Sequence, residues 1–289
     1  MTSNTELFSN LSTYANYSAC AMIATSIILL IYTYTSKIYG AGYGRHYNKN
    51  DKNFANKGFL IDAKIAWIVM ESASWVGVLL TILLVNSQLE KDAENQNLWN
   101  QNSTYHKKFI QLVTGIIPYV LHYIHRANIY PFFTNSTAPM TCVITSMAMA
   151  FCAWNGTTQT LTLFGLFQYE KEQNIEFNYY GLIIFCLGLA INMSADYTLL
   201  LIKAENKGYQ VPNNLLYRFF NVSSLNYFGE LVEWSGFAIF NDNRFAPWAF
   251  VVFTFANLAP RAYMNHQWYV DRFGEKLPKN RKILIPYVW

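Results

Sequence analysis

The chain has 289 residues, of which 53% are hydrophobic, 17% aromatic and 13% charged, with a formal net charge of +4. Soluble domains carry about 25% charged residues, so this composition excludes an ordinary soluble protein. It favours a polytopic helical membrane protein, and we expect no nucleic-acid partner and no obligate protein partner.

In chain order, seven apolar segments are long enough to be transmembrane helices. They cover residues 19–36, 60–85, 109–125, 139–166, 178–201, 222–241 and 245–263. We therefore predict an all-α integral membrane protein with seven transmembrane helices, in which residues 1–289 form a single domain. Its location would be the endoplasmic reticulum membrane in a eukaryote or the inner membrane in a bacterium.

Basic residues between the segments indicate the orientation of the chain. The loops after the first and fifth segments and the C-terminal tail are rich in lysine and arginine, whereas the loop after the fourth segment is net acidic. The positive-inside rule then places the N-terminus outside or in the lumen and the C-terminus in the cytoplasm. The basic side would attract anionic lipid headgroups or hold the phosphates of a dinucleotide, and the two interpretations are compatible.

Polar side chains inside the apolar segments are the strongest functional signal. Glu71 is the only charge deep in the second segment. Asn226, Glu230 and Glu233 follow one another at i, i+4 and i+7, so a helix places them on one face. An acidic residue at the centre of a transmembrane helix costs about 2.5–3.5 kcal/mol. Other segments carry further polar groups: His122, His125 and Arg126; Asn192 and Asp196; Arg261, Asn265 and Tyr269.

Two interpretations of these polar groups remain open. Any one of them can join helices through hydrogen bonds, and those near segment ends can reach the interface. Five segments contribute such groups to one interior, however, and that number favours a pathway or a buried polar ligand. We predict no metal site, because the His122 and His125 pair, spaced i, i+3, has no carboxylate partner in the sequence nearby.

These motifs together resemble the steroid 5α-reductase family. The resemblance covers about residue 40 to the C-terminus, and its tail motif is specific. The blocks that carry it are Gly42-Tyr-Gly-Arg45, Ala66-Trp-Ile-Val-Met-Glu71, His122-Tyr-Ile-His-Arg126, Phe151-Cys-Ala-Trp-Asn-Gly156, Asn192-Met-Ser-Ala-Asp196, Asn226-Tyr-Phe-Gly-Glu-Leu-Val-Glu-Trp234, Arg261-Ala, His266-Gln-Trp-Tyr269 and Pro278-Lys-Asn-Arg-Lys-Ile-Leu-Ile-Pro286.

The resemblance implies an NADPH-dependent reductase that reduces the Δ4 double bond of a 3-oxosteroid by hydride transfer to the β-carbon of the enone. It implies that Glu71 and Tyr123 are catalytic and hold the keto oxygen, with Trp67 and Met70 beside the substrate. It implies a cofactor site formed by Tyr43, Arg126, Asn192, Asp196, Lys203, Tyr209, Asn226, Glu230, Arg261, Asn265 and Tyr269. Three positions depart from the family pattern: Met70 stands in place of Gln, Asn265 in place of His, and Lys203 where Arg is frequent.

The expected mechanism follows from enone chemistry. Hydride addition to the β-carbon leaves negative charge on the carbonyl oxygen, where one missing donor typically costs about 2.7–4 kcal/mol. Tyr123 can donate a hydrogen bond to that oxygen, and Glu71 can do so when protonated, which burial favours. No GxGxxG motif follows a strand, so we expect the dinucleotide to enter between helices from the basic side.

Other functions fit the same pattern. The enzyme would act on another enone or enoyl lipid, such as an enoyl-CoA or a polyprenal, or would be a membrane methyltransferase of the isoprenylcysteine type. A transporter or proton channel would use Glu71, Asp196, Glu230 and Glu233 as a relay. A transporter predicts an internal repeat or paired broken helices, and the sequence contains neither.

Overall fold

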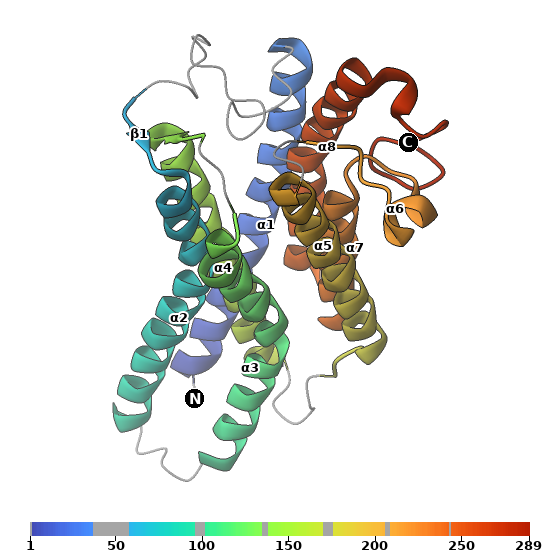
Figure 1. Cartoon of the computed structure of the whole chain (residues 1–289). Coiled ribbons are helices and arrows are strands. Elements are labelled where there is room, and N and C mark those ends of the chain that lie inside the picture. The colour runs from blue at the N-terminus through green and yellow to red at the C-terminus, as the bar shows by residue number, and fades with distance from the viewer. Residues whose placement is uncertain are drawn as a thin grey trace.

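The computed structural model describes residues 2–36, 58–95, 102–134, 138–169, 176–205, 209–242 and 244–289. In these residues the chain forms eight α-helices (Figure 1) and a two-residue antiparallel pair, β1 (Leu60–Ile61) with β2 (Met140–Thr141). The all-α prediction is therefore confirmed. The helices are α1 (Thr2–Ser36), α2 (Ala63–Asn95), α3 (Asn102–Ile124), α4 (Cys142–Tyr169), α5 (Tyr179–Glu205), α6 (Leu215–Phe220), α7 (Leu225–Phe240) and α8 (Phe245–Phe273).

Each predicted apolar segment overlaps with one helix, but the ends differ. Helix α1 begins at Thr2 instead of residue 19, and α8 continues to Phe273 instead of ending at residue 263. The reason is that a helix satisfies its own backbone hydrogen bonds and continues into water without loss. An apolar stretch therefore marks the part of a helix that suits lipid, and not the whole helix.

Three helices are long and apolar enough to cross a membrane, over Ser9–Thr35, Ala63–Gln88 and Tyr179–Ala204. Each exposes large apolar side chains: Ile28, Leu84 and Leu187 are 65%, 72% and 57% exposed. Such surfaces suit lipid and indicate a multi-pass membrane protein. Helix α7 has only 16 residues and is about 24 Å long, which is less than the ~30 Å hydrocarbon core.

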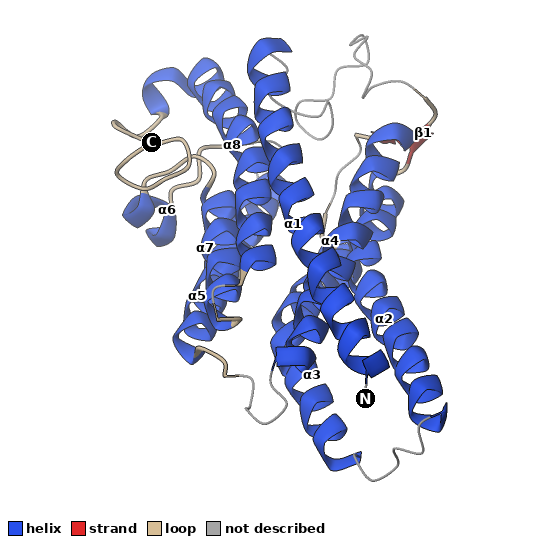
Figure 2. Ribbon diagram, turned by 180° about the vertical axis from the view of Figure 1, so that it is seen from behind, coloured by secondary structure: helices blue, strands red, loops and turns tan. Residues whose placement is uncertain are grey.

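The long helices form two groups that α1 connects. Helix α2 packs along α4, and α5 packs along α7, which in turn contacts α8. Helix α1 crosses between the groups and contacts both α4 and α8 (Figures 1 and 2). The polar residues of the N-terminal half and of the C-terminal half therefore face one another across the middle of the molecule.

Helices α5 and α7 approach one another closely because glycines face the partner backbone. A Cβ atom on Gly229 would collide with the backbone of Asn192, and one on Gly188 with the backbone of Glu233. Close approach over small residues is typical of helix pairs in membranes. It brings the polar residues of α5 directly against those of α7.

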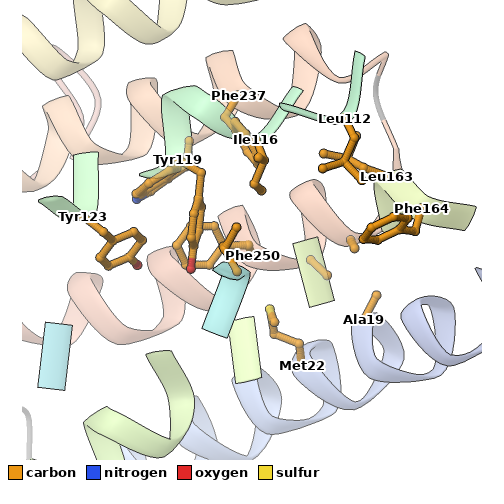
Figure 3. Close-up of a cluster of buried hydrophobic side chains, with 14 of the residues drawn as sticks. Ala19, Met22, Leu112, Ile116, Tyr119, Tyr123, Leu163, Phe164, Phe237 and Phe250 are labelled. Carbon is orange, nitrogen blue, oxygen red and sulfur yellow. The ribbon is translucent and has the colours of Figure 1, made fainter. Parts of the chain in front are cut away.

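A hydrophobic cluster that is rich in aromatic rings fills the space where the two groups meet. Side chains from α1, α3, α4, α7 and α8 contribute to it (Figure 3). Trp234 is fully buried at its centre, and its ring centroid lies 4.7 Å from Phe250 and 5.7 Å from Tyr119. Figure 3 shows Tyr119 and Tyr123 next to one another on α3. This cluster anchors the helices that carry the site.

The C-terminal tail returns to the segment between α5 and α7. The Lys282 amide donates to the Asn221 carbonyl oxygen over 2.8 Å, and the Ser223 amide donates to the Lys282 carbonyl oxygen over 2.8 Å. Arg281 is buried and donates to the carbonyl oxygens of Pro212 and Val222. Burial lowers the pKa of Arg281, although an arginine remains charged at neutral pH. The fifth loop and the tail thus lie together, as the sequence predicts.

Candidate active site

A cavity of about 380 Å³ lies between the two groups of helices. Its wall includes residues of α2, α3, α4, α5, α7 and α8. It also includes the π-helix η4 (His125–Ile129) and the 3-10 helix η5 (Tyr130–Phe132), which continue α3. Eight of the eleven residues predicted to bind the cofactor, and all four predicted to bind the substrate, line this one cavity.

The wall formed by α2, β2 and α4 is apolar. Met70 and Met140 are buried there against Trp67 and Ile144. Glu71 is the exception, because it brings a carboxyl to this otherwise apolar wall of the cavity. A ligand in the cavity would therefore meet one carboxyl on its apolar side.

The opposite wall is polar and is held by a buried network. Arg126 donates to Asp196 Oδ2 over 2.9 Å, and the Asn226 side-chain amide donates to Asp196 Oδ1 over 2.8 Å. The Asn192 amide donates to the Asn226 carbonyl oxygen over 2.9 Å. A buried ion pair is tolerated where its remaining oxygens and protons are also hydrogen-bonded. The network therefore holds η4, α5 and α7 in one arrangement around the cavity.

The change from α-helix to π-helix positions Arg126. A π-turn contains an extra residue and shifts the side chains that follow it. In this turn the Trp67 indole N–H donates to the Arg126 carbonyl oxygen over 3.1 Å. The Arg126 guanidinium lies 5.1 Å from the Trp67 ring and 5.5 Å from the Tyr130 ring. Aromatic rings and Asp196 together keep this cation at the cavity wall.

The surroundings of Glu230 indicate that the cavity suits a polar ligand. It lines the cavity, and its Oε2 atom is buried without a hydrogen-bond donor among the residues that the structure describes. A buried acceptor without a partner costs about 1–3 kcal/mol, and more when it is charged. A ligand that brings amide or hydroxyl hydrogens would satisfy it.

Comparison with known proteins then identifies the family. The model of the family described as 3-oxo-5-alpha-steroid 4-dehydrogenase matches residues 138–289. The steroid 5-alpha-reductase DET2 of Solanum lycopersicum is 34% identical over 254 residues, or 86% of this chain and 87% of that protein. The chain belongs to the 3-oxo-5-alpha-steroid 4-dehydrogenase family.

A second relative supports the same assignment over nearly the whole chain. The 3-oxo-5-alpha-steroid 4-dehydrogenase 1 of Bos taurus is 31% identical over 274 residues, or 94% of this chain and 95% of that protein. The predicted resemblance to the steroid 5α-reductases is confirmed, and the chain is an oxidoreductase of this family.

Three predicted cofactor residues of this reductase do not lie in the described cavity wall. Tyr43 falls outside the residues that the structure describes. Asn192 is not part of the wall, but its side-chain amide donates to the Asn226 carbonyl oxygen. Tyr269 is 2% exposed and packs on Trp268, with 5.2 Å between the ring centroids.

The other predicted cofactor residues on the polar side do reach the cavity. Lys203 and Tyr209 lie together, with 5.7 Å from Lys203 Nζ to the Tyr209 ring. Asn265 lines the cavity and donates to Ser224 Oγ over 3.3 Å. Asn257 also lines it and was not among the predicted site residues. Extending the i, i+4 series of Arg261 and Asn265 back by one turn gives this position.

His122 also lines the cavity, although it was not among the predicted site residues. The sequence grouped His122, His125 and Arg126 on one helix face. In the structure His122 Nδ1 lies 2.6 Å from Glu233 Oε1, whereas His125 Nε2 lies 3.1 Å from the Tyr197 hydroxyl. The two histidines separate because the π-helix begins at His125.

Proposed function

We propose that this protein reduces the Δ4 double bond of a 3-oxosteroid with NADPH. The observation that carries the proposal is that Glu71 and Tyr123 line one cavity between an apolar wall and a polar wall. The names of the relatives, steroid 5-alpha-reductase and 3-oxo-5-alpha-steroid 4-dehydrogenase, support the same substrate class.

The apolar wall suits the rigid hydrocarbon of a steroid. Met70, Met140 and Ile144 offer it contact area without competing polar groups. Glu71 and Tyr123 are then the groups that recognise the keto oxygen, because a single polar contact sets the orientation of an otherwise apolar ligand. Trp67 lies next to Met70 in the same wall.

The polar wall suits a nicotinamide dinucleotide. Glu230 offers an acceptor to amide or ribose hydrogens, and Asn226 lines the same wall with its side-chain nitrogen bonded to Asp196. Arg126, Lys203 and Arg261 add positive charge near the cavity, as phosphates require. When bound, NADPH supplies the hydride.

The protein residues stabilise the charge that develops on the carbonyl oxygen. Tyr123 donates one hydrogen bond, and protonated Glu71 donates a second. Each such donor is worth about 2.7–4 kcal/mol in a site that excludes water. Trp234 stacks against Tyr123 with 5.8 Å between ring centroids, so the phenol keeps its orientation while charge develops.

We further propose that all helices except the six-residue α6 are the seven membrane-crossing helices of one domain, with α7 spanning only part of the hydrocarbon core. The basic fifth loop and the tail then lie in the cytoplasm and the N-terminus lies outside or in the lumen. This orientation gives a cytoplasmic dinucleotide access to the polar wall. The host membrane would be the endoplasmic reticulum or a bacterial inner membrane.

A direct assay tests the function. The purified protein, in nanodiscs, is mixed with NADPH and a 3-oxo-Δ4-steroid, and the product is analysed by mass spectrometry. We expect the steroid to gain two hydrogens in proportion to the NADPH consumed. An enoyl-CoA and a polyprenal are tested beside it. Faster reduction of either one, with no steroid product, would replace the steroid assignment by that substrate.

A further inference from the structure

A buried histidine–carboxylate pair lies beside the proposed site. His122 Nδ1 is 2.6 Å from Glu233 Oε1, and their side chains are only 4% and 0% exposed. Glu233 Oε2 is buried and has no other partner among the described residues. In the part of the chain that the structure describes, His122 is thus the group that stabilises this carboxyl.

The pair has one face toward the cavity. His122 lines the cavity, whereas Glu233 does not. Trp234 covers the imidazole with 4.6 Å between ring centroids, and Tyr123 meets it edge-on at 5.0 Å. Because Nδ1 is engaged by Glu233, the opposite edge of the ring, which carries Nε2, is the part left for the cavity.

Burial favours a pair that carries no net charge. Such a pair holds two protons, one between Glu233 Oε1 and His122 Nδ1 and the other on His122 Nε2. Among the charged groups that act on the ring, the Glu230 carboxylate supports this form because it opposes a further negative charge beside it, whereas Glu71 carries no charge when it is protonated. Arg126 and Asp196 act on the ring from η4 and α5 and are paired with each other.

We propose that His122 is the acid that protonates the α-carbon during the reduction, and that Glu233 is its positioning residue. This inference rests on the proposed function. The Nε2–H bond breaks, the electron pair of the enolate forms the new C–H bond, and the carbonyl re-forms at the oxygen held by Glu71 and Tyr123. The shared proton then resides on Nδ1, and Glu233 becomes the carboxylate that faces it.

The reverse proton transfer gives a test that consumes no cofactor. In D₂O, His122 would remove a hydrogen from the α-carbon of the saturated 3-ketone and return deuterium. The wild-type protein is incubated with the saturated ketone, with and without NADPH, and deuterium at the α-carbon is measured by mass spectrometry. The saturated ketone has no carbon–carbon double bond for NADPH to reduce, so deuterium at the α-carbon reports proton transfer alone.

The decisive variant is His122→Gln. General acid–base groups contribute about 10²–10⁴-fold to rate, so we expect exchange and kcat for the enone to fall about a hundredfold, with KM changed little. Glu233→Gln keeps an oxygen and an amide near the ring but cannot accept the proton, and we expect a loss of about tenfold. Glu233→Gln also serves as the test if His122→Gln does not fold. Melting temperatures of both variants show whether they fold.

His125→Gln is the matched control, because His125 lies outside the cavity wall and bonds Tyr197. This variant should keep the wild-type rates of deuterium exchange and of enone reduction. If His122→Gln or Glu233→Gln exchanges as fast as wild type while wild type reduces the enone, this inference fails and the proposed function stands. If wild type reduces the enone but shows no exchange, the inference fails as well. If wild type does not reduce the enone, both fail.

Discussion

Single residues in the cavity differ in how their charge is stabilised. The Arg126 guanidinium and the Asp196 carboxylate pair over 2.9 Å, and Asn226 takes the second carboxylate oxygen. By contrast, Glu230 Oε2 has no such partner among the described residues. The first set is therefore held in place before a ligand binds, whereas Glu230 Oε2 remains available to a hydrogen-bond donor of the ligand.

Glu71 gives the sharpest prediction at this scale. Glu71→Ala removes a donor to the keto oxygen and should lower turnover at saturating NADPH about a hundredfold or more. Glu71→Gln keeps a donor and should lose less. Turnover and melting temperature are measured on the same preparations. A role in joining helices would instead lower the melting temperature and leave turnover per folded molecule unchanged. A stable, fully active Glu71→Ala would refute the mechanism.

Asn226 and Arg261 should matter more for cofactor than for substrate. Asn226→Ala leaves Asp196 Oδ1 without its donor, which costs about 1–3 kcal/mol, and Arg261→Ala removes a cation from the polar wall. We expect each to raise the NADPH dissociation constant about tenfold or more in a binding titration. Arg244→Ala, at the other end of α8, is the control. Unchanged dissociation constants in both variants would place the dinucleotide elsewhere.

At the scale of elements, the α5–α7 pair determines where the polar network forms. The pair packs backbone to backbone at Gly188 and Gly229, and Asn192 and Asn226 are joined across it. Neither helix alone could hold Asp196 beside Asn226, because these residues lie on different helices. The close approach is therefore a requirement of the site as well as of the fold.

Gly229→Ala tests this packing. The added methyl group would meet the Asn192 backbone, and overpacking of this kind costs about 1–3 kcal/mol. We expect a lower melting temperature and weaker NADPH binding together. Ser194→Ala, on the exposed side of α5, should change neither. A variant as stable as wild type that binds NADPH equally well would show that the helices separate without harm to the site.

At the scale of the whole molecule, two helix groups contribute different chemistry to one cavity. The α2–α4 group provides the apolar wall and Glu71, and the α5–α7–α8 group provides most of the polar wall. Helix α1 contacts both groups and keeps them together. The tail binds the segment that follows α5. The same segment brings Tyr209 against Lys203 at the cavity wall.

This distribution of charge predicts a cofactor preference. The 2′-phosphate of NADPH should interact with the basic residues of the fifth loop, the tail and the first loop, whereas NADH lacks this group. We expect NADPH to bind at least tenfold more tightly, which is about 1.4 kcal/mol. The preference should shrink as salt is added, because ions screen exposed charges. Equal affinity for the two cofactors at low salt would argue against a 2′-phosphate site.

The amino-acid sequence alone was sufficient to predict the class of fold, the long helices and many of the polar residues that line the cavity. Apolar length reveals a helix that suits lipid, and a spacing of four residues places side chains on one face. For this reason Asn226 and Glu230, and likewise Arg261 and Asn265, were predicted together and lie together.

Only the tertiary structure decided which part of each face meets the cavity and which part meets another helix. Glu233 continues the face of Glu230, yet it turns to His122 because α3 packs against it there. His125 leaves the face of His122 because the π-turn adds a residue and breaks the helical spacing. Periodicity is a local property of one helix, whereas burial and partner choice depend on neighbours that are distant in sequence.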